Sequence, residues 1–288
     1  MHAPLQFSFK EVVTAIADQN KPAYESMATR PFLKWVGGKR SILSELTKRL
    51  PAQYGTYREP FIGGGALYFA TQPGRAYLAD VNFHLICAYK AVRDDVDTLI
   101  ELLHGYEEKH NKDNFLKARK RLSTEKDSTK IAALLIYLNK TCFNGLYRVN
   151  KAGEFNVPIG DYDDPSLFEE DVLRNDSKQL QGVTIQQHSF FHTPIAREDF
   201  FYLDPPYHEL YAQYSGGGFG EDEHKRLATF CQEIQTSGAF FMLSNSDTDF
   251  VRGLYRRFHI EEVSAARTVS CKAHQRGRKN ELIIRNYQ

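Results

Sequence analysis

Eight residues near position 200, Phe-Phe-Tyr-Leu-Asp-Pro-Pro-Tyr, most constrain the fold of this 288-residue chain. The apolar run 200–203 predicts a strand buried on both faces, as in the centre of a parallel sheet. Pro205 and Pro206 end it, because neither can donate a ladder hydrogen bond. We expect a rigid turn presenting Asp204 and Tyr207 where open α/β sheets bind ligands. Taken alone, the tetrapeptide would be explained more simply as a strand end with a solvated aspartate.

Length and composition suit one large α/β domain, or a core domain with one insertion. Hydrophobic residues make up 42% of the chain and the net charge is only +1, so the total charge indicates no partner. Between Arg252 and Lys279, however, eight Lys or Arg residues face only two acids. The four widely spaced cysteines argue against a zinc site or disulfides. Without a membrane-spanning run or a signal peptide, we expect a soluble cytoplasmic protein.

Two strand-and-turn segments predict half of a nucleoside-binding unit. Residues 57–67 combine a strand, the turn Gly63-Gly64-Gly65 and the start of a helix. Glycines are needed where the backbone takes positive φ or approaches a ligand closely, although this spacing is not the dinucleotide fingerprint. Residues 76–80 form a second strand that ends in Asp80, a position from which an acid accepts hydrogen bonds from ribose.

A further glycine turn precedes this unit. Trp35 and Lys39 flank Gly37-Gly38, but the phosphate-loop pattern fails because position 33 is Leu and Ser41 comes one residue too late. An aromatic face and an ammonium group beside a turn would suit a zwitterionic small ligand. A core tryptophan beside a surface lysine explains the segment equally well.

The middle of the chain is predicted to be helical over 85–91, 96–110, 115–122 and 130–140, which indicates a helical lobe inserted between two halves of the sheet. It leads into a hairpin within 143–160 whose Arg and Asn side chains could pair with guanine and adenine edges. An ordinary solvated hairpin has the same composition. Strands at 183–187 and 239–244, a mobile glycine-rich loop at 211–220, a helix at 221–236 and a terminal hairpin from 255–263 and 281–286 complete the prediction.

Taken in order, these segments resemble the Dam-type DNA adenine-N6 methyltransferases of the D12 class. The matching stretches are 32–39, 59–67, 78–82, 143–150, 153–160, 204–207 and 244–247. The resemblance implies a Rossmann-like α/β methyltransferase sheet with helices on both faces and an inserted, mainly helical DNA-recognition domain containing a hairpin. It divides the chain into an extension (1–30), a catalytic domain (31–83 and 183–288) and a target-recognition domain (84–182).

The resemblance also implies roles for individual residues. S-adenosylmethionine would be the cofactor, and no metal would be needed. Asp204 and the Pro205 carbonyl would accept hydrogen bonds from the target adenine, and Tyr207 would stack on the flipped base. Pro206 would complete the catalytic motif. The cofactor-binding residues would be Trp35, Lys39, Phe61, Gly63, Gly65, Asp80 and Asp204. The DNA target would be a short sequence in double-stranded DNA, GATC, and the residues that contact it would be Lys34, Phe143, Asn144, Leu146, Arg148 and Pro158. We expect a monomer without an obligate protein partner, from a restriction–modification, host or phage system.

The chain departs from the family pattern twice. Asp161-Tyr162-Asp163-Asp164 stands where basic residues are common, and His188-Ser189 follows the strand at 183–187, where an acid often holds the cofactor adenine. Three alternatives remain open at this point. They are methylation of cytosine N4, a non-catalytic DNA-binding relative, and an RNA substrate; the aspartate of Asp-Pro-Pro-Tyr favours adenine.

Overall fold

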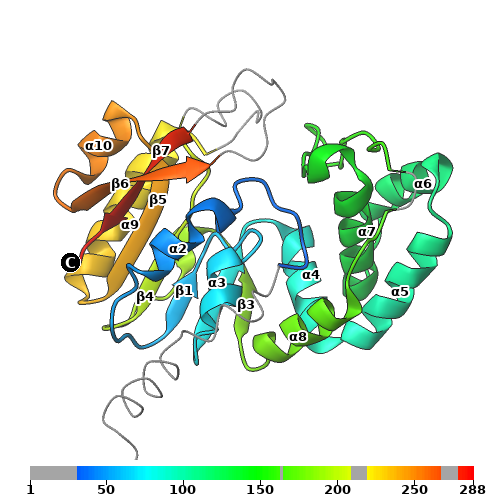
Figure 1. The fold of residues 1–288 in the computed structure, drawn as a ribbon, viewed down its shortest axis with the longest axis horizontal. Helices are drawn as coiled ribbons and strands as arrows, with labels where there is room; N and C mark the ends of the chain where they lie inside the picture. Colours follow the sequence, from blue (N-terminus) through cyan, green and yellow to red (C-terminus); the bar gives the residue numbers. More distant parts are fainter. Residues whose placement is uncertain (1–30, 163–164, 209–218, 267–277) are drawn as a thin grey trace, which may run out of the picture.

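The structure is a computed structural model that describes residues 31–162, 165–208, 219–266 and 278–288. These residues form a seven-stranded sheet covered by helices, with a helical lobe beside one edge (Figure 1). The predicted α/β fold class is confirmed. Residues 211–218 of the predicted glycine-rich loop, the extension 1–30 and the basic stretch 267–277 lie outside the described residues.

The sheet has the order β3-β2-β1-β4-β5-β7-β6. Neighbouring strands are parallel from β3 through β5, whereas β7 pairs antiparallel with both β5 and β6. The chain order reverses between β1 and β4, so the ligand crevice of such a sheet lies beyond the carboxyl ends of these two strands. The strands are β1 (Tyr57–Glu59), β2 (Ala76–Asp80), β3 (Thr184–Gln187), β4 (Phe200–Leu203), β5 (Phe240–Ser246), β6 (His259–Ala266) and β7 (Arg278–Arg285).

Strand β4 is buried along its whole length, as its apolar sequence predicts. Because side chains alternate along a strand, Phe200 and Tyr202 pack into one apolar cluster and Phe201 and Leu203 into another. The second cluster includes residues of helices α9 (Glu221–Thr236) and α10 (Asp249–Tyr255). The strand that carries the Asp-Pro-Pro-Tyr turn is therefore held firmly from both sides.

The helical lobe is built around α7 (Ser128–Thr141), in which residues 131–138 are all buried. It is surrounded by α4 (Phe83–Asp94), α5 (Val96–Glu108) and α6 (Lys112–Leu122), and α4 also contacts β2 and β3. The four helices predicted in this region are confirmed with small shifts of their ends. The other helices of the described residues are η2 (Lys39–Ile42), α2 (Leu43–Thr47), α3 (Ala66–Thr71), η3 (Phe143–Gly145), α8 (Glu170–Leu180) and η4 (Phe190–His192).

Two predictions of local structure need correction. The hairpin within 143–160 is not a regular ladder: it has the short helix η3 and two isolated antiparallel bridges, Cys142–Ile159 and Val149–Phe155. The terminal hairpin begins at His259 rather than at residue 255, because α10 occupies the preceding segment. Thr248 starts that helix by accepting a hydrogen bond from the Val251 amide.

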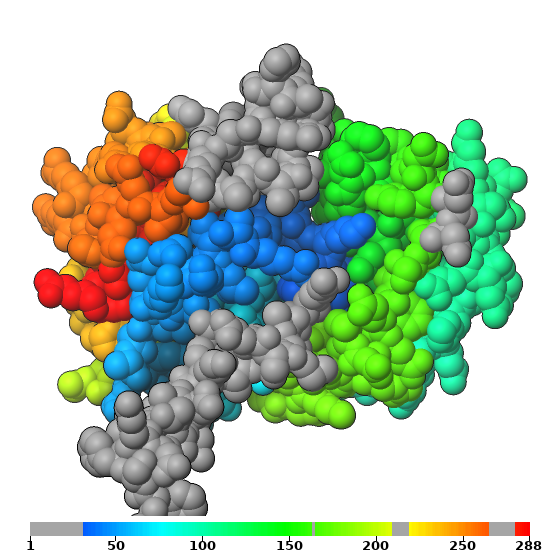
Figure 2. All heavy atoms as spheres, viewed as in Figure 1, coloured from blue at the N-terminus to red at the C-terminus, as the bar shows by residue number. Residues whose placement is uncertain are grey.

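The segment that begins at Pro31 lies between the sheet and the helical lobe, as the blue atoms of Figure 2 show. It is joined to the lobe by hydrogen bonds between Lys34 and Asn139, and to the sheet by an ion pair between Lys39 and Asp204. In the described part of the chain, no helix is long and apolar enough to cross a membrane.

Candidate active site

Asp204 lies directly after β4 and meets two partners. Its Oδ1 accepts a hydrogen bond of 2.8 Å from Ser244 Oγ and lies 2.8 Å from Lys39 Nζ. Ser244 reaches it because Leu203 is paired with Leu243 in the β4–β5 register, so the next residues of both parallel strands stand side by side. Tyr202 OH is 3.2 Å from the same hydroxyl. The carboxylate is thus fixed from the neighbouring strand and by a cation.

Burial raises the pKa of Asp204, although the Lys39 ammonium and the Ser244 hydroxyl act in the opposite direction. The Lys39 and Asp204 side chains are only 7% and 17% exposed, so their attraction is poorly screened by solvent. An anionic Asp204 in this site therefore depends on the cation beside it.

Tyr207 completes this corner. Its hydroxyl donates a 2.7 Å hydrogen bond to Glu281 Oε2 on β7, and Lys39 Nζ lies 4.6 Å from the centre of its ring. Lys39 also donates to the Gly37 carbonyl at 2.6 Å. The lysine ammonium therefore occupies the space between the Asp204 carboxylate and the face of Tyr207.

The triple-glycine turn follows β1 and leads into α3, with positive φ at Gly63 (47°) and Gly65 (68°). Its inner side is packed by aromatic residues: a Cβ at Gly63 would lie 3.0 Å from Trp35 Cδ1, and one at Gly65 would lie 2.6 Å from Tyr89 OH. Both the backbone angle and this packing require glycine. The structure thus joins Trp35 to the turn, two segments that sequence alone leaves separate.

Asp80 ends β2 beside the same turn. Its Oδ2 accepts a hydrogen bond from the Gly63 amide at 3.3 Å, and its Oδ1 accepts one from the Asn82 amide at 2.9 Å. Burial raises the pKa of Asp80 to about 6, and these backbone donors only partly offset it. Asp80 therefore stands at the carboxyl end of β2, the neighbour of β1, as an acceptor whose charge changes in a mildly acidic range.

Phe61 and His188 lie further along this edge. Phe61 is half-buried and stacks on Phe190, with ring centres 5.4 Å apart and Phe219 edge-on at 5.7 Å. His188 Nε2 is 2.7 Å from Tyr77 OH. The position after β3 is thus held by His188, which pairs with Tyr77 of β2, and not by the acid that the family resemblance leads us to expect there.

The predicted DNA-contacting residues gather around the end of α7. The buried Asn139 amide bonds both backbone groups of Lys34 and the Gly145 carbonyl, at 2.8–3.0 Å. The Phe143 amide donates to the Pro158 carbonyl at 3.0 Å. One side chain of α7 therefore ties the segment before Gly37-Gly38 to residues 143–160, named the recognition segment because they are predicted to contact DNA.

The predicted DNA-contacting side chains differ in their exposure to solvent. Phe143 is 47% exposed, and Asn144 takes a left-handed backbone conformation at φ 55°. Arg148 is exposed and donates to Asn156 Oδ1 at 2.7 Å, whereas Leu146 packs partly against the core. Phe143, Asn144 and Arg148 are thus the best placed to meet a large ligand.

Three residues of this region were given no role by sequence reasoning: Ser244, Glu281 and Tyr147. Ser244 lies within a stretch matched to the family, and strand pairing is what brings it to Asp204. Glu281 lies opposite Ser246 in the β5–β7 register. Tyr147 stacks on Trp35, with ring centres 5.4 Å apart. Only the spatial arrangement identifies these residues.

Comparison with known proteins shows the family of this chain. The family described as D12 class N6 adenine-specific DNA methyltransferase matches residues 35–269. The chain is 40% identical to the type II methyltransferase M.MjaIII of Methanocaldococcus jannaschii, over 91% of this chain and 100% of that protein. It is 35% identical to M1.LlaDCHI of Lactococcus lactis (90% and 95% covered) and 33% identical to the DNA adenine methylase of Vibrio cholerae (88% and 95% covered). This chain belongs to the D12 class of N6 adenine-specific DNA methyltransferases.

Proposed function

We propose that this enzyme transfers the methyl group of S-adenosylmethionine to N6 of an adenine flipped out of double-stranded DNA, with GATC as its target. The observation that carries the proposal is the corner formed by Asp204, Ser244 and Tyr207. It combines a carboxylate held by a neighbouring hydroxyl with an aromatic face, at the carboxyl end of β4. This is the edge of the sheet at which ligands bind.

The chemistry of the amine calls for such a corner. An exocyclic adenine amine is a poor nucleophile because its lone pair is delocalised into the ring. Asp204 and the Pro205 carbonyl would accept its two hydrogens and stabilise the positive charge that develops on nitrogen as it attacks. Pro205 and Pro206 fix these acceptors, and Ser244 holds the carboxylate from one side.

Tyr207 would provide the platform for the flipped base, because a base inside a duplex cannot reach this site. Its hydroxyl bond to Glu281 fixes the ring. Lys39 lies over that ring and against Asp204, so it has to move before a base can stack there. Its ammonium would then be available to the carboxylate of the methionine part of the cofactor.

The residues around the glycine turn fit S-adenosylmethionine, which supplies an electrophilic methyl group when bound. Asp80 offers a carboxylate acceptor for ribose hydroxyls, and Trp35 offers an aromatic face near a cationic ligand. Gly63 and Gly65 let the backbone take positive φ while it packs against Trp35 and Tyr89, which fixes the shape of the turn, and Phe61 would line its floor. Trp35, Lys39, Phe61, Gly63, Gly65, Asp80 and Asp204 are thus the proposed cofactor residues.

The recognition segment would read the target. Arg148 and Asn144 carry the side-chain types that pair with guanine and adenine, and the exposed ring of Phe143 suits a wedge between bases. Lys34, Leu146 and Pro158 would support them. We accordingly propose that residues 84–182 form the target-recognition domain, with the catalytic domain formed by 31–83 and 183–288.

The test uses tritiated S-adenosylmethionine and unmethylated duplex DNA, with the wild type compared with Asp204→Ala, followed by digestion to nucleosides. We expect label in N6-methyladenine with the wild type and none with the variant, while both bind the cofactor. Mapping of the modified sites tests GATC. Label in cytosine N4, label only in RNA, or no label despite cofactor binding would each contradict the proposal.

A further inference from the structure

Tyr147 belongs to the recognition segment but its ring lies on the cofactor side of the molecule. It is stacked on Trp35 at 5.4 Å with an interplanar angle of 25°, and Phe155 closes its edge at 5.9 Å. Its hydroxyl is 2.8 Å from Nδ1 of His84, near the start of α4. The ring is thus held on three sides by groups from three different parts of the chain.

Trp35 transmits this contact to the glycine turn. Its indole and its Cβ would lie 3.0 Å and 3.3 Å from Cβ atoms at Gly63 and Gly64, so no free space separates the indole from the turn. The Gly63 amide in turn donates to Asp80. A displacement of the Tyr147 ring would therefore release Trp35 and alter the wall of the proposed cofactor site.

Tyr147 is equally tied to the residues proposed to contact DNA. Its neighbour Arg148 is exposed and is held by Asn156, whose amide also donates to the Arg148 carbonyl at 3.0 Å. Val149 bridges to Phe155, the residue that packs on the Tyr147 ring. Seating a base pair against Arg148 would therefore act directly on the backbone that positions Tyr147.

We propose that Tyr147 is a positioning residue through which the DNA-recognition segment sets the affinity of the cofactor site. The inference rests on the proposed function, since it assumes S-adenosylmethionine at the glycine turn and DNA at Arg148. Coupling between two sites is reciprocal: the factor by which DNA changes cofactor affinity equals the factor by which cofactor changes DNA affinity. The stacked pair of Tyr147 and Trp35 determines the size of this coupling factor.

The experiment measures binding without turnover. Calorimetry gives the affinity for S-adenosylmethionine without DNA, and fluorescence anisotropy gives the affinity for a labelled GATC duplex with and without the unreactive product S-adenosylhomocysteine. The variants are Tyr147→Leu, which removes the ring, Tyr147→Met, which fills its space differently, and Tyr147→Phe, which keeps the stack. Val149→Ala is the matched control, because it keeps the backbone bridge to Phe155 and shortens only an exposed side chain of the same segment.

We expect Tyr147→Leu and Tyr147→Met to bind the cofactor about two- to tenfold more weakly, the range that an aromatic pair contributes. Their coupling factor should fall towards one, with the affinity for DNA alone close to that of Val149→Ala. Tyr147→Phe should restore most of the cofactor affinity. When the cofactor concentration is varied, the loss should appear in the KM for S-adenosylmethionine rather than in kcat.

Wild-type cofactor affinity and coupling in folded Tyr147→Leu or Tyr147→Met would overturn the inference and leave the proposed function intact. An equal loss in Val149→Ala would also overturn it, because the effect would then be a general loosening of the segment. Failure of the wild type to bind S-adenosylmethionine at all would instead overturn the proposed function, and this inference with it.

Discussion

Lys39 Nζ lies 2.8 Å from Asp204 Oδ1, so the lysine of the Gly-Gly-Lys turn is paired with the aspartate of the Asp-Pro-Pro-Tyr turn. The same ammonium lies over the Tyr207 ring. A hydrogen-bond donor thus occupies the position proposed for the adenine amine, and its charge opposes the rise that burial causes in the pKa of Asp204.

The hydroxyl of Ser244 should matter for the chemical step. Ser244→Ala removes one of the two close partners of Asp204, and a hydrogen bond to a charged group contributes about 1.5–3 kcal/mol. We expect the single-turnover methylation rate to fall about ten- to a hundredfold with little change in cofactor affinity. Ser237→Ala, just past the end of α9, is the control; an unchanged rate in Ser244→Ala would show that the hydroxyl does not position the carboxylate.

Loss of the lysine should shift the pH profile of the reaction upward. Burial raises the pKa of Asp204 and Lys39 lowers it, so Lys39→Met leaves a carboxyl that protonates at higher pH. A protonated Asp204 is a poor acceptor, and kcat/KM should therefore be lost at higher pH in the variant than in the wild type. The pH dependence of kcat/KM checks this, because it reports the free enzyme, in which Lys39 is still paired with Asp204; coincident profiles would contradict it.

Glu281→Gln should shift the same profile in the opposite direction. The negative charge of Glu281 raises the pKa of Asp204, and glutamine removes that charge while keeping an oxygen acceptor for the Tyr207 hydroxyl. We expect activity to persist to lower pH than in the wild type. An upward shift in both variants would indicate that they act on the fold rather than on the charge of Asp204.

Cofactor binding should weaken in mild acid. Burial raises the pKa of Asp80 to about 6, and the ionised form is the stronger acceptor for a ribose hydroxyl. Affinity for S-adenosylmethionine should be full above this pKa and fall as pH drops through about 6. Calorimetry on Asp80→Asn should show weaker binding without this pH dependence. A wild-type affinity that is flat between pH 5 and 8 would argue against an ionised Asp80 in cofactor binding.

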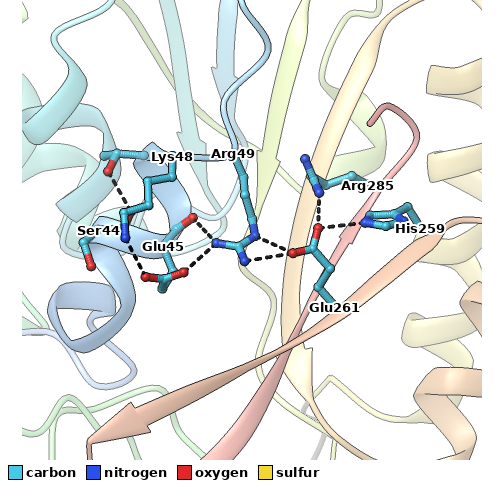
Figure 3. A network of polar contacts seen from close by, with 8 residues as sticks. Ser44, Glu45, Lys48, Arg49, His259, Glu261 and Arg285 are labelled. Atoms are coloured by element: carbon cyan, nitrogen blue, oxygen red, sulfur yellow. Dashed lines mark hydrogen bonds and ion pairs between the residues drawn. The ribbon is translucent and has the colours of Figure 1, made fainter.

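The contacts drawn in Figure 3 should stabilise the fold at neutral pH. Arg49, just after α2, bonds Glu45 and also Glu261 on β6, which is bonded by His259 and Arg285 as well. Glu261→Gln should lower the free energy of unfolding by about 1–2 kcal/mol, because the network is only partly buried. Thermal unfolding of both proteins at pH 7 measures the difference.

The same pair of proteins tests the sign of the pH effect. Partial burial opposes ionisation, but hydrogen bonds from Arg49, His259 and Arg285 lower the pKa of Glu261 to about 2, from 4.5 in an open chain. The contribution is therefore complete above about 4.5 and is lost as pH falls towards 2. The stability difference between wild type and Glu261→Gln should narrow over that window, and a widening difference would contradict the assignment.

Much of the sheet could be predicted from local sequence. The bounds of β2, β4 and α9 agree with their predictions because each has an unambiguous apolar pattern and a clear stop signal. Helix α10 is not predicted, because residues 249–254 carry no predicted element and only Tyr255 falls within the predicted terminal hairpin, although Thr248-Asp249 is a recognisable helix start. Helix α8 was missed as well, since its few buried apolar residues, such as Leu173 and Leu180, lie among many charges.

The site was less predictable than the sheet for a different reason. The motif residues Asp80, Asp204 and Tyr207 could be named because strand ends meet at one edge. The contacts of Lys39 with Asp204, of Tyr207 with Glu281 and of Tyr147 with Trp35 depend on register and on packing across the chain. No local pattern encodes such pairings, so only the folded structure shows them.

Trp35 is the chain's single tryptophan, so its near-ultraviolet emission reports on one defined place in the molecule. One side of its indole touches the glycine turn, and Tyr147 from the recognition segment is stacked on the ring. The unlabelled protein therefore contains its own optical probe. The wavelength of maximum emission and the fluorescence intensity should change when a ligand binds at the glycine turn or at the recognition segment, in real time and without any added dye.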